Sequence, residues 1–490
     1  MDFSTLIRNL KKKLFEKEPR QSDTSHIQTS PVMKDSVPAV LESIPDTLEK
    51  RPPYFIQIGF DFGTSYSKCV CRDVMTDKAW VHIPDKCVAN ELPFLIPSVL
   101  LLKDGQIGLV DNPEYHYPEN GLYHLKSALV KIALNQWDDP VLVPYRNAVR
   151  SEKLQLRNFV ETSAIYFLAG AVGDVRAQIR KRFPEFGSHS KDYMAINLAV
   201  PVADAQHPKI NRLYQKILCE AWKLADNLAG HPLIRLSDLE SLRKENESEV
   251  SSINEACFIY PEVSANVQGF VRSRVSSEGI YLFSDTGAST VDQGIFIFVR
   301  RNGSESLNYL HGSVLPLGSS QIERNAAINS GNLNFHILEK LRKMKEQGEP
   351  SLEIEKARMS IAKEMRKETI ATLAYGKKKL YVKDQLNEIK IIFGGGGHCE
   401  YPYRRAVMQS FSCDLFRKPL KPDVIGLPFP PDLELKGSEA RWMSRISVAY
   451  GLSFVRDDLA LFTYPKDVST PKLEEIWPRR KKIPDFPEND

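Results

Sequence analysis

Short apolar runs that end in glycine-containing turns constrain the fold of this chain most strongly. The first run covers residues 55–60, stops in the turn 59–67, and is followed by a second apolar stretch at residues 67–71. Two apolar runs of this length on either side of a glycine-containing turn predict a β-hairpin. We therefore expect the folded region to start at Tyr54 with a buried hairpin.

Two further turns of this kind occur later in the chain. The apolar run 279–284 leads into the turn 285–292 and then into a second run at residues 295–299, which repeats the design of the first hairpin. The run 389–393 ends in four consecutive glycines at positions 394–397. Backbone that lacks a Cβ atom can approach a bound nucleotide closely. Each turn is therefore a candidate nucleotide contact, although a single glycine run is a weak signal.

The first turn combines the groups that phosphate binding needs. Gly63 lets backbone N–H groups approach phosphate oxygens, and the hydroxyls of Thr64 and Ser65 add donors. Asp61 can hold Mg²⁺ through water. Glycine turns with one acidic residue also occur in ordinary hairpins. Two interpretations are therefore open, a phosphate-binding turn and a purely structural one.

Taken together, in this order and at these separations, the three turns resemble the phosphate-one, phosphate-two and adenosine motifs of one superfamily. That superfamily contains actin, the sugar kinases and the heat-shock protein 70 chaperones. The intervening segments are most similar to the nucleotide-binding domain of heat-shock protein 70, over roughly residues 54–456. The similar segments are residues 94–129, 195–204, 261–266 and 445–453.

The resemblance implies an α/β protein with the two-lobed actin/heat-shock-protein-70-type ATPase fold, in which duplicated ribonuclease-H-like lobes enclose a nucleotide cleft. ATP or ADP and Mg²⁺ would be its ligands. The implied organisation is lobe I at residues 54–277 with a polar insert at 231–254, lobe II at 278–440, a closing helix of lobe I at 441–456, and a tail at 457–490. The charge pattern of the insert predicts an exposed helix and loop.

Roles for single residues also follow from the resemblance. Asp61 and Asp285 would hold the Mg²⁺ shell, and Glu262 and Asp292 would orient the attacking water. In-line phosphoryl transfer depends mostly on positioning and charge neutralisation, so two such turns around one metal suffice. The same carboxylates could instead be ordinary turn caps. The remaining nucleotide contacts would come from Gly63, Thr64, Ser65, Thr286, Gly287, Gly394, Gly395 and Gly396.

The sequence departs from the chaperone pattern at two places. Asn112 stands where the family has a phosphate-contacting lysine, so the expected cation is missing there. Lys68 sits where actins keep such a lysine and could supply the charge, or it could be a solvated hairpin lysine. Ala288 and Ser289 replace glycines of the phosphate-two turn, which narrows the space for the γ-phosphate. We therefore expect hydrolysis to be slow or lost.

The amino-terminal region has a different character. Residues 1–17 have apolar positions at helical spacing with four basic residues between them, which predicts a basic amphipathic helix. Residues 18–53 are rich in Ser, Thr, Pro and charge, which is typical of a disordered linker. The helix could contact a protein partner or the surface of a membrane. Seven scattered cysteines and the absence of a long apolar run favour a cytoplasmic protein. Such a protein could also attach peripherally to the inner membrane surface.

The leading functional hypothesis is a heat-shock-protein-70-like ATPase that acts as a nucleotide-dependent switch on an unknown protein partner. Few residues follow the closing helix, so no β-rich peptide-binding domain is expected. The alternatives are a filament-forming actin-like cytoskeletal ATPase and a nucleotide-binding scaffold without turnover. A net charge of only +4 gives no reason to expect nucleic-acid binding.

Overall fold

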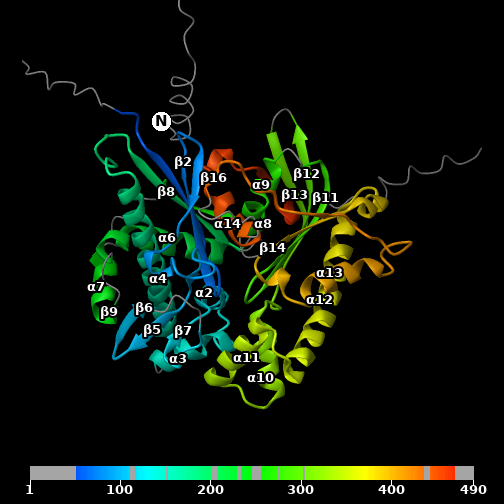
Figure 1. The fold of residues 1–490 in the computed structure, drawn as a ribbon, viewed down its shortest axis with the longest axis horizontal. Helices are drawn as coiled ribbons and strands as arrows, with labels where there is room; N and C mark the ends of the chain where they lie inside the picture. The colour runs from blue at the N-terminus through cyan, green and yellow to red at the C-terminus, as the bar shows by residue number, and fades with distance from the viewer. Residues whose placement is uncertain are drawn as a thin grey trace, which may run out of the picture.

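The protein is a mixed α/β protein, as the sequence predicts, with several sheets and long helices (Figure 1). The fold is known from a computed structural model. It describes residues 51–110, 116–149, 153–200, 207–228, 233–245, 255–273, 276–301, 304–434 and 442–468. The predicted amphipathic helix at 1–17 and nearly all of the predicted linker lie outside these residues.

The first hairpin opens a large sheet, as expected. β1 pairs antiparallel with β2 and parallel with β8, and β8 pairs parallel with β10. Every residue of β1 is buried, which fits an apolar strand covered on both faces. The sheet has the order β10-β8-β1-β2-β3-β16, with β4 beside β2. Its strands are β1 (Phe55–Asp61), β2 (Tyr66–Asp73), β3 (Lys78–Val81), β4 (Ile96–Pro97), β8 (Tyr193–Val200), β10 (Cys257–Pro261) and β16 (Leu433–Glu434).

A second sheet repeats this arrangement with the later turns. β11 pairs antiparallel with β12 and parallel with β14, and β14 pairs parallel with β15. The order β15-β14-β11-β12-β13 therefore matches β10-β8-β1-β2-β3 strand for strand. The strands are β11 (Gly279–Thr286), β12 (Val291–Arg301), β13 (Ser304–Leu315), β14 (Lys390–Gly394), β15 (Val424–Ile425) and β17 (Leu461–Thr463).

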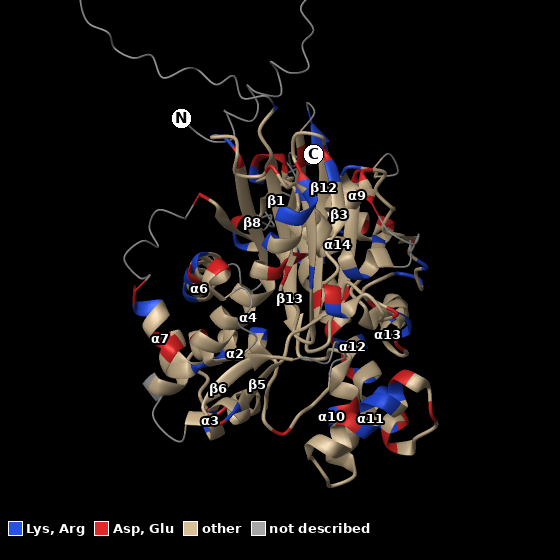
Figure 2. Cartoon of the chain, turned by 60° about the vertical axis from the view of Figure 1, so that its left-hand side comes forward, with Lys and Arg blue, Asp and Glu red and all other residues tan. Residues whose placement is uncertain are grey.

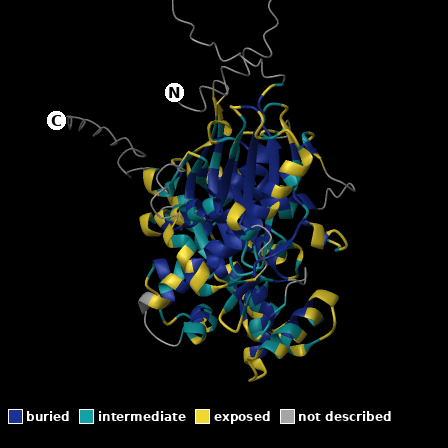
Figure 3. Cartoon of the chain, turned by 90° about the vertical axis from the view of Figure 1, so that its left-hand side faces the viewer, coloured by how far each residue is buried: buried dark blue, intermediate teal, exposed yellow. Residues whose placement is uncertain are grey.

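Helices cover both sheets, so the strands form the buried centre of the molecule (Figure 3). Helices α4 and α6 pack on the first sheet, and α10, α12 and α13 share a core with the second. Helices α8, α9 and α14 lie between the two sheets (Figure 1). The helices are α2 (Leu125–Ala133), α3 (Val143–Val149), α4 (Lys153–Arg182), α6 (Pro208–Leu228), α7 (Leu236–Glu245), α8 (Glu262–Asn266), α9 (Gln268–Val271), α10 (Ser320–Asn329), α11 (Phe335–Gln347), α12 (Leu352–Lys379), α13 (Tyr403–Gln409) and α14 (Met443–Leu452).

Local sequence signals mark the ends of the helices on the second sheet. The side chain of Asn334 accepts a hydrogen bond from the backbone N–H of Ile337 at the start of α11, and Gly348 ends that helix with a φ of 70°. Ser351 caps α12 in the same way. Lys, Arg, Asp and Glu residues are frequent on the outer helices, α11 in particular, whereas the strands have few of them (Figure 2). None of the helices in the described ranges is long and apolar enough to cross a membrane.

The described part of the polar insert, residues 233–245, is mostly exposed, as the sequence predicted, and it also adds a strand to a small sheet. Its residues 233–235 form β9, which pairs antiparallel with β6 in a small sheet, and α7 follows directly. Leu239 is fully buried, and Arg243 donates to Glu220 at 2.9 Å. The insert therefore packs one leucine on its own side of the molecule, while most of residues 233–245 stay exposed, as the charge pattern predicted; residues 231–232 and 246–254 lie outside the described residues. The small sheet has the order β7-β5-β6-β9, with β5 (Leu100–Lys103), β6 (Gln106–Leu109), β7 (Gly121–Leu122) and β9 (Leu233–Arg235).

Three predicted boundaries need correction. Arg51, placed in the disordered linker, forms an ion pair with the buried carboxylate of Asp192. Residues 433–434, placed in lobe II, form β16 on the edge of the first sheet because Leu433 fills its core. Residues 461–463, placed in the tail, form β17, which pairs parallel with β13. Leu459 is buried just before it, so the folded region extends past residue 456.

One glycine of β1 sets how closely α14 approaches the first sheet. A Cβ atom at Gly59 would lie 2.1 Å from the carbonyl oxygen of Ala449 and 2.5 Å from the backbone nitrogen of Ser453. Both are backbone atoms that cannot rotate away, so Gly59→Ala is expected to lower the free energy of unfolding by about 3 kcal/mol. The control is Gly426→Ala, where nothing lies within 4 Å of the added methyl group. Urea unfolding measures both, and equal stabilities would show that α14 can shift without cost.

Candidate functional site

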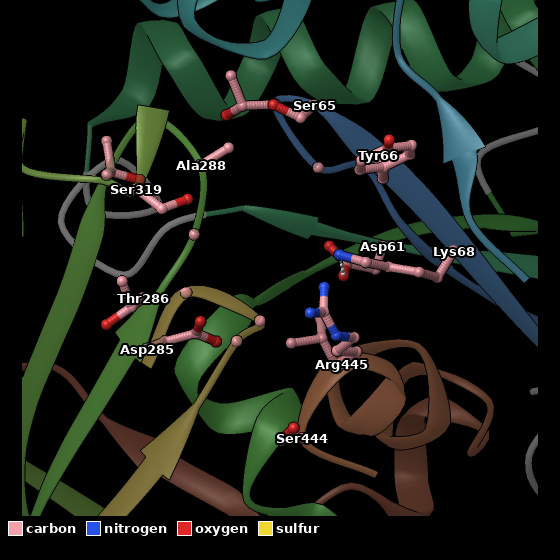
Figure 4. Close-up of a pocket in the computed structure, with 18 of the residues that line it drawn as sticks. Asp61, Ser65, Tyr66, Lys68, Asp285, Thr286, Ala288, Ser319, Ser444 and Arg445 are labelled. Carbon is pink, nitrogen blue, oxygen red and sulfur yellow. Dashed lines mark hydrogen bonds and ion pairs between the residues drawn. The ribbon is translucent and has the colours of Figure 1, made fainter. Parts of the chain in front are cut away.

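The three turns meet in one cleft between the two sheets (Figure 4). The cleft has a volume of about 230 Å³. Twelve of the thirteen predicted site residues line it: Asp61, Gly63, Thr64, Ser65, Lys68, Glu262, Asp285, Thr286, Gly287, Asp292, Gly395 and Gly396. Residues more than 300 positions apart in the sequence are thereby brought together.

The first turn presents a carboxylate held by a lysine. Asp61 ends β1 and lies opposite Lys68 in the hairpin register, and the Nζ of Lys68 is 2.8 Å from the Oδ2 of Asp61. The Oδ1 of Asp61 is buried and has no hydrogen-bond partner among the residues that the structure describes. A Cβ atom at Gly63 would lie 2.0 Å from the carbonyl oxygen of Tyr66, so the turn requires glycine there. Lys68 is thus paired with Asp61 and is not a solvated hairpin lysine, while its contact with phosphate stays a prediction.

The second turn presents a carboxylate with a supporting network. Asp285 lies at the end of β11, directly opposite Asp292 in β12. The side-chain amide of Asn266 donates to the Oδ2 of Asp285, and Ser447 donates to Asn266 in turn. Burial, followed by the neighbouring carboxylates of Glu262 and Asp61, raises the pKa of Asp285 to about 7. This crowding of negative charge favours a cation in the cleft.

The third turn packs its backbone against the second turn. Gly395 has a φ of 75°, and a Cβ atom there would lie 2.2 Å from the Oδ1 of Asp285. A Cβ atom at Gly396 would lie 2.3 Å from the guanidinium of Arg445, which reaches into the cleft from α14 (Figure 4). Gly394 does not line the cleft, contrary to the prediction. It is the last residue of β14, pairs with Asp285, and packs against Phe283 beneath the turn.

Lys126 places in the cleft a cation that sequence reasoning did not single out. It lies in the first turn of α2, and its Nζ is 2.6 Å from the Oε2 of Glu262. Burial lowers the pKa of Lys126, but the carboxylates of Glu262, Asp61 and Asp292 more than offset this and raise it, so the side chain stays charged. Asn112 falls outside the described residues. The only sequence signal for Lys126 is its place in the segment 94–129, which resembles the chaperone family.

The donor set in the cleft fits a hydrated magnesium ion. Oxygen atoms of Asp61 and Asp285 face the cleft from opposite turns, and oxygen ligands are those that Mg²⁺ prefers. In the part of the chain that the structure describes, no group of three or more His, Cys, Asp or Glu side chains could hold a metal ion directly. An ion here would therefore keep several water molecules and take further ligands from a bound phosphate, which is usual for Mg²⁺.

Compared with the models of known protein families and with curated proteins, the sequence matches none of them. The function must therefore be argued from the cleft itself.

Proposed function

We propose that this chain is a magnesium-dependent ATP-binding protein with the two-lobed actin/heat-shock-protein-70-type fold, and that it hydrolyses ATP. One observation carries the proposal. The two sheets have the same strand order, and their equivalent hairpins, β1–β2 and β11–β12, face each other across one cleft lined by backbone, hydroxyls and carboxylates. This symmetry supports the proposal, because two such turns facing each other could bind one polyphosphate between them.

The groups that line the cleft would bind the phosphates and neutralise their charge. Backbone of the Gly63 and Gly287 turns, with the hydroxyls of Thr64 and Ser65, would bind phosphate oxygens. Lys126 and Lys68 would neutralise phosphate charge as point donors. Asp61 and Asp285 would hold Mg²⁺ through water, and the metal would supply positive charge beside the phosphates.

Two carboxylates that line the cleft would orient the attacking water. Glu262 and Asp292 both line the cleft, and both can accept a hydrogen bond from water. Lys126 already holds Glu262 by an ion pair of 2.6 Å, which fixes the position of this carboxylate. No side chain needs to act as a covalent nucleophile, because positioning and charge neutralisation supply most of the rate.

The location of the cleft between the sheets supports a switching function. A nucleotide bound there would contact both sides of the molecule, and its hydrolysis would change how they close on each other. We therefore propose a nucleotide-dependent switch that acts on a protein partner, with residues 1–17 as a candidate contact to that partner or to a membrane surface. Ordered filaments in the presence of Mg²⁺ and ATP would favour the actin-like alternative instead.

Binding of Mg²⁺ and ATP is tested most directly by thermal unfolding. At a ligand concentration one hundred times the dissociation constant, the protein is expected to gain about 2.7 kcal/mol of stability. The melting temperature should rise with ATP and Mg²⁺, and the rise should shrink when EDTA removes the metal. The absence of any rise would contradict the binding proposal. A rise without release of phosphate above background would identify a scaffold without turnover.

A further inference from the structure

A second and larger cavity lies beside the nucleotide cleft. Its volume is about 520 Å³, against about 230 Å³ for the cleft. One wall is formed by β7, α3 and the start of α2, and the other by α10 and the start of α11, which approach each other at the lower end of the molecule (Figure 1). The proposed ATPase function makes no use of this cavity.

The two cavities lie on opposite sides of the second glycine turn. Ala288 and Ser319 line the cleft, whereas their neighbours Ser289 and Ser320 line the second cavity. The hydroxyls of Ser127 and Ser289 are 3.3 Å apart, which joins the two walls between the cavities. The second cavity is therefore a separate site and not an extension of the cleft.

Most of the lining is apolar. Leu122, Val141 and Leu338 contribute aliphatic surface, and Tyr123 meets Phe335 edge to face with ring centroids 5.9 Å apart. Val143 and Leu333 stand on opposite walls and remain 42% and 52% exposed. Apolar side chains gathered in a cavity of this size are typical of a site for a small organic molecule.

One charged group in the cavity lacks a partner. Arg324, on α10, lines the cavity and makes no hydrogen bond or ion pair with any residue in the described ranges. Its neighbours on the same helices are paired, since Glu323 binds Lys345 at 2.6 Å and Arg342 binds Glu339 at 2.9 Å. A guanidinium left open in an apolar cavity is suited to a carboxylate or another small oxyanion such as a sulfonate.

Nearby acidic groups do not satisfy Arg324. Asp139 is near enough for Arg324 to help lower its pKa, but its carboxylate is paired with Lys131 at 2.9 Å. Glu119 also lines the cavity, yet it is 71% exposed at the rim and lies 3.3 Å from His336. His124 adds a neutral polar group, because burial and the charge of Arg324 lower its pKa to about 4.

We propose that this cavity binds a small organic anion, with an aromatic or branched aliphatic body between the two walls and one carboxylate or sulfonate group on Arg324. The apolar walls hold the body by burial, and the guanidinium selects the charge. The proposal concerns a site other than the nucleotide cleft, so it stands or falls independently of ATP binding.

The test uses 8-anilinonaphthalene-1-sulfonate, an aromatic anion whose fluorescence rises in apolar surroundings. The full chain is expected to bind one molecule saturably in the presence of excess Mg²⁺ and ATP. Arg324→Gln should weaken this binding at least tenfold. Val143→Glu, which adds a negative charge at an exposed position on the rim, should weaken it as well. The matched control is Arg417→Gln, which removes an exposed guanidinium remote from the cavity and should leave binding unchanged.

Two results would overturn the proposal. One is equal affinity of the wild type and the Arg324→Gln variant for the anion. The other is displacement of the anion by Mg²⁺ and ATP, which would place the probe in the nucleotide cleft. A cationic aromatic dye, thioflavin T, tests the charge preference, because it should bind the wild type at least tenfold more weakly than the anion does.

Discussion

The Asp285→Asn variant is expected to lose magnesium-dependent ATP hydrolysis by at least about 100-fold, since it removes one of the two carboxylates that face the proposed metal. Asparagine keeps an oxygen that can accept the hydrogen bond from Asn266, so the local network is expected to survive. Phosphate release at saturating ATP with varied Mg²⁺ measures the loss. Asp457→Asn, at an exposed carboxylate outside the cleft, is the control and should hydrolyse like the wild type.

The same variant separates loss of function from loss of fold. The pKa of Asp285 is raised to about 7 by burial and nearby carboxylates, so the folded protein binds this proton more tightly than the unfolded chain does. Its contribution to stability is therefore present at low pH and is lost as the pH rises through 7. At pH 8 without Mg²⁺, the Asp285→Asn variant should melt no lower than the wild type. A variant that melts lower and is inactive would mean that Asp285 mainly supports the fold.

The sequence predicted the three turns because their information is local. Each is an apolar strand followed by glycine and small polar residues, and such a pattern determines backbone path over only a few residues. That Asp61, Asp285 and Gly395 meet in one cleft was inferred from the family resemblance, and the structure brings them together. Gly394 differs by one position because a strand end cannot be located that closely from sequence.

The features that sequence reasoning missed all depend on contacts between distant segments. The residues next to Lys126 in the sequence do not distinguish it from a surface lysine on α2. Its position in the cleft is evident only from its 2.6 Å contact with Glu262. The strand at residues 233–235 was missed because its pairing with β6 joins residues more than 100 positions apart in the chain. Similarly, the strand at residues 461–463 is defined by pairing with β13, more than 150 positions earlier in the chain.

The Lys126→Met variant is expected to lose both hydrolysis and stability. Hydrolysis should fall by about 10²- to 10³-fold, as when one donor that stabilises developing charge is removed from a preorganised site. The free energy of unfolding should fall by about 3 kcal/mol, because Glu262, whose side chain is only 12% exposed, loses its partner. Lys131→Met on the same helix is the control, since its partly exposed pair with Asp139 is worth less than about 1 kcal/mol.

Combining Lys126→Met with Glu262→Gln distinguishes a catalytic role of the lysine from a structural one. The glutamine carries no charge to be left unpaired, so the double variant should regain most of the lost stability, as judged by urea unfolding. Hydrolysis should stay low, because the double variant still lacks the cation that would neutralise phosphate and the carboxylate that would orient water. A single Lys126→Met variant that hydrolyses ATP at the wild-type rate would reduce the role of Lys126 to that of a partner for Glu262. Phosphate neutralisation in the cleft would then rest on Lys68, which is the cation that the sequence first suggested.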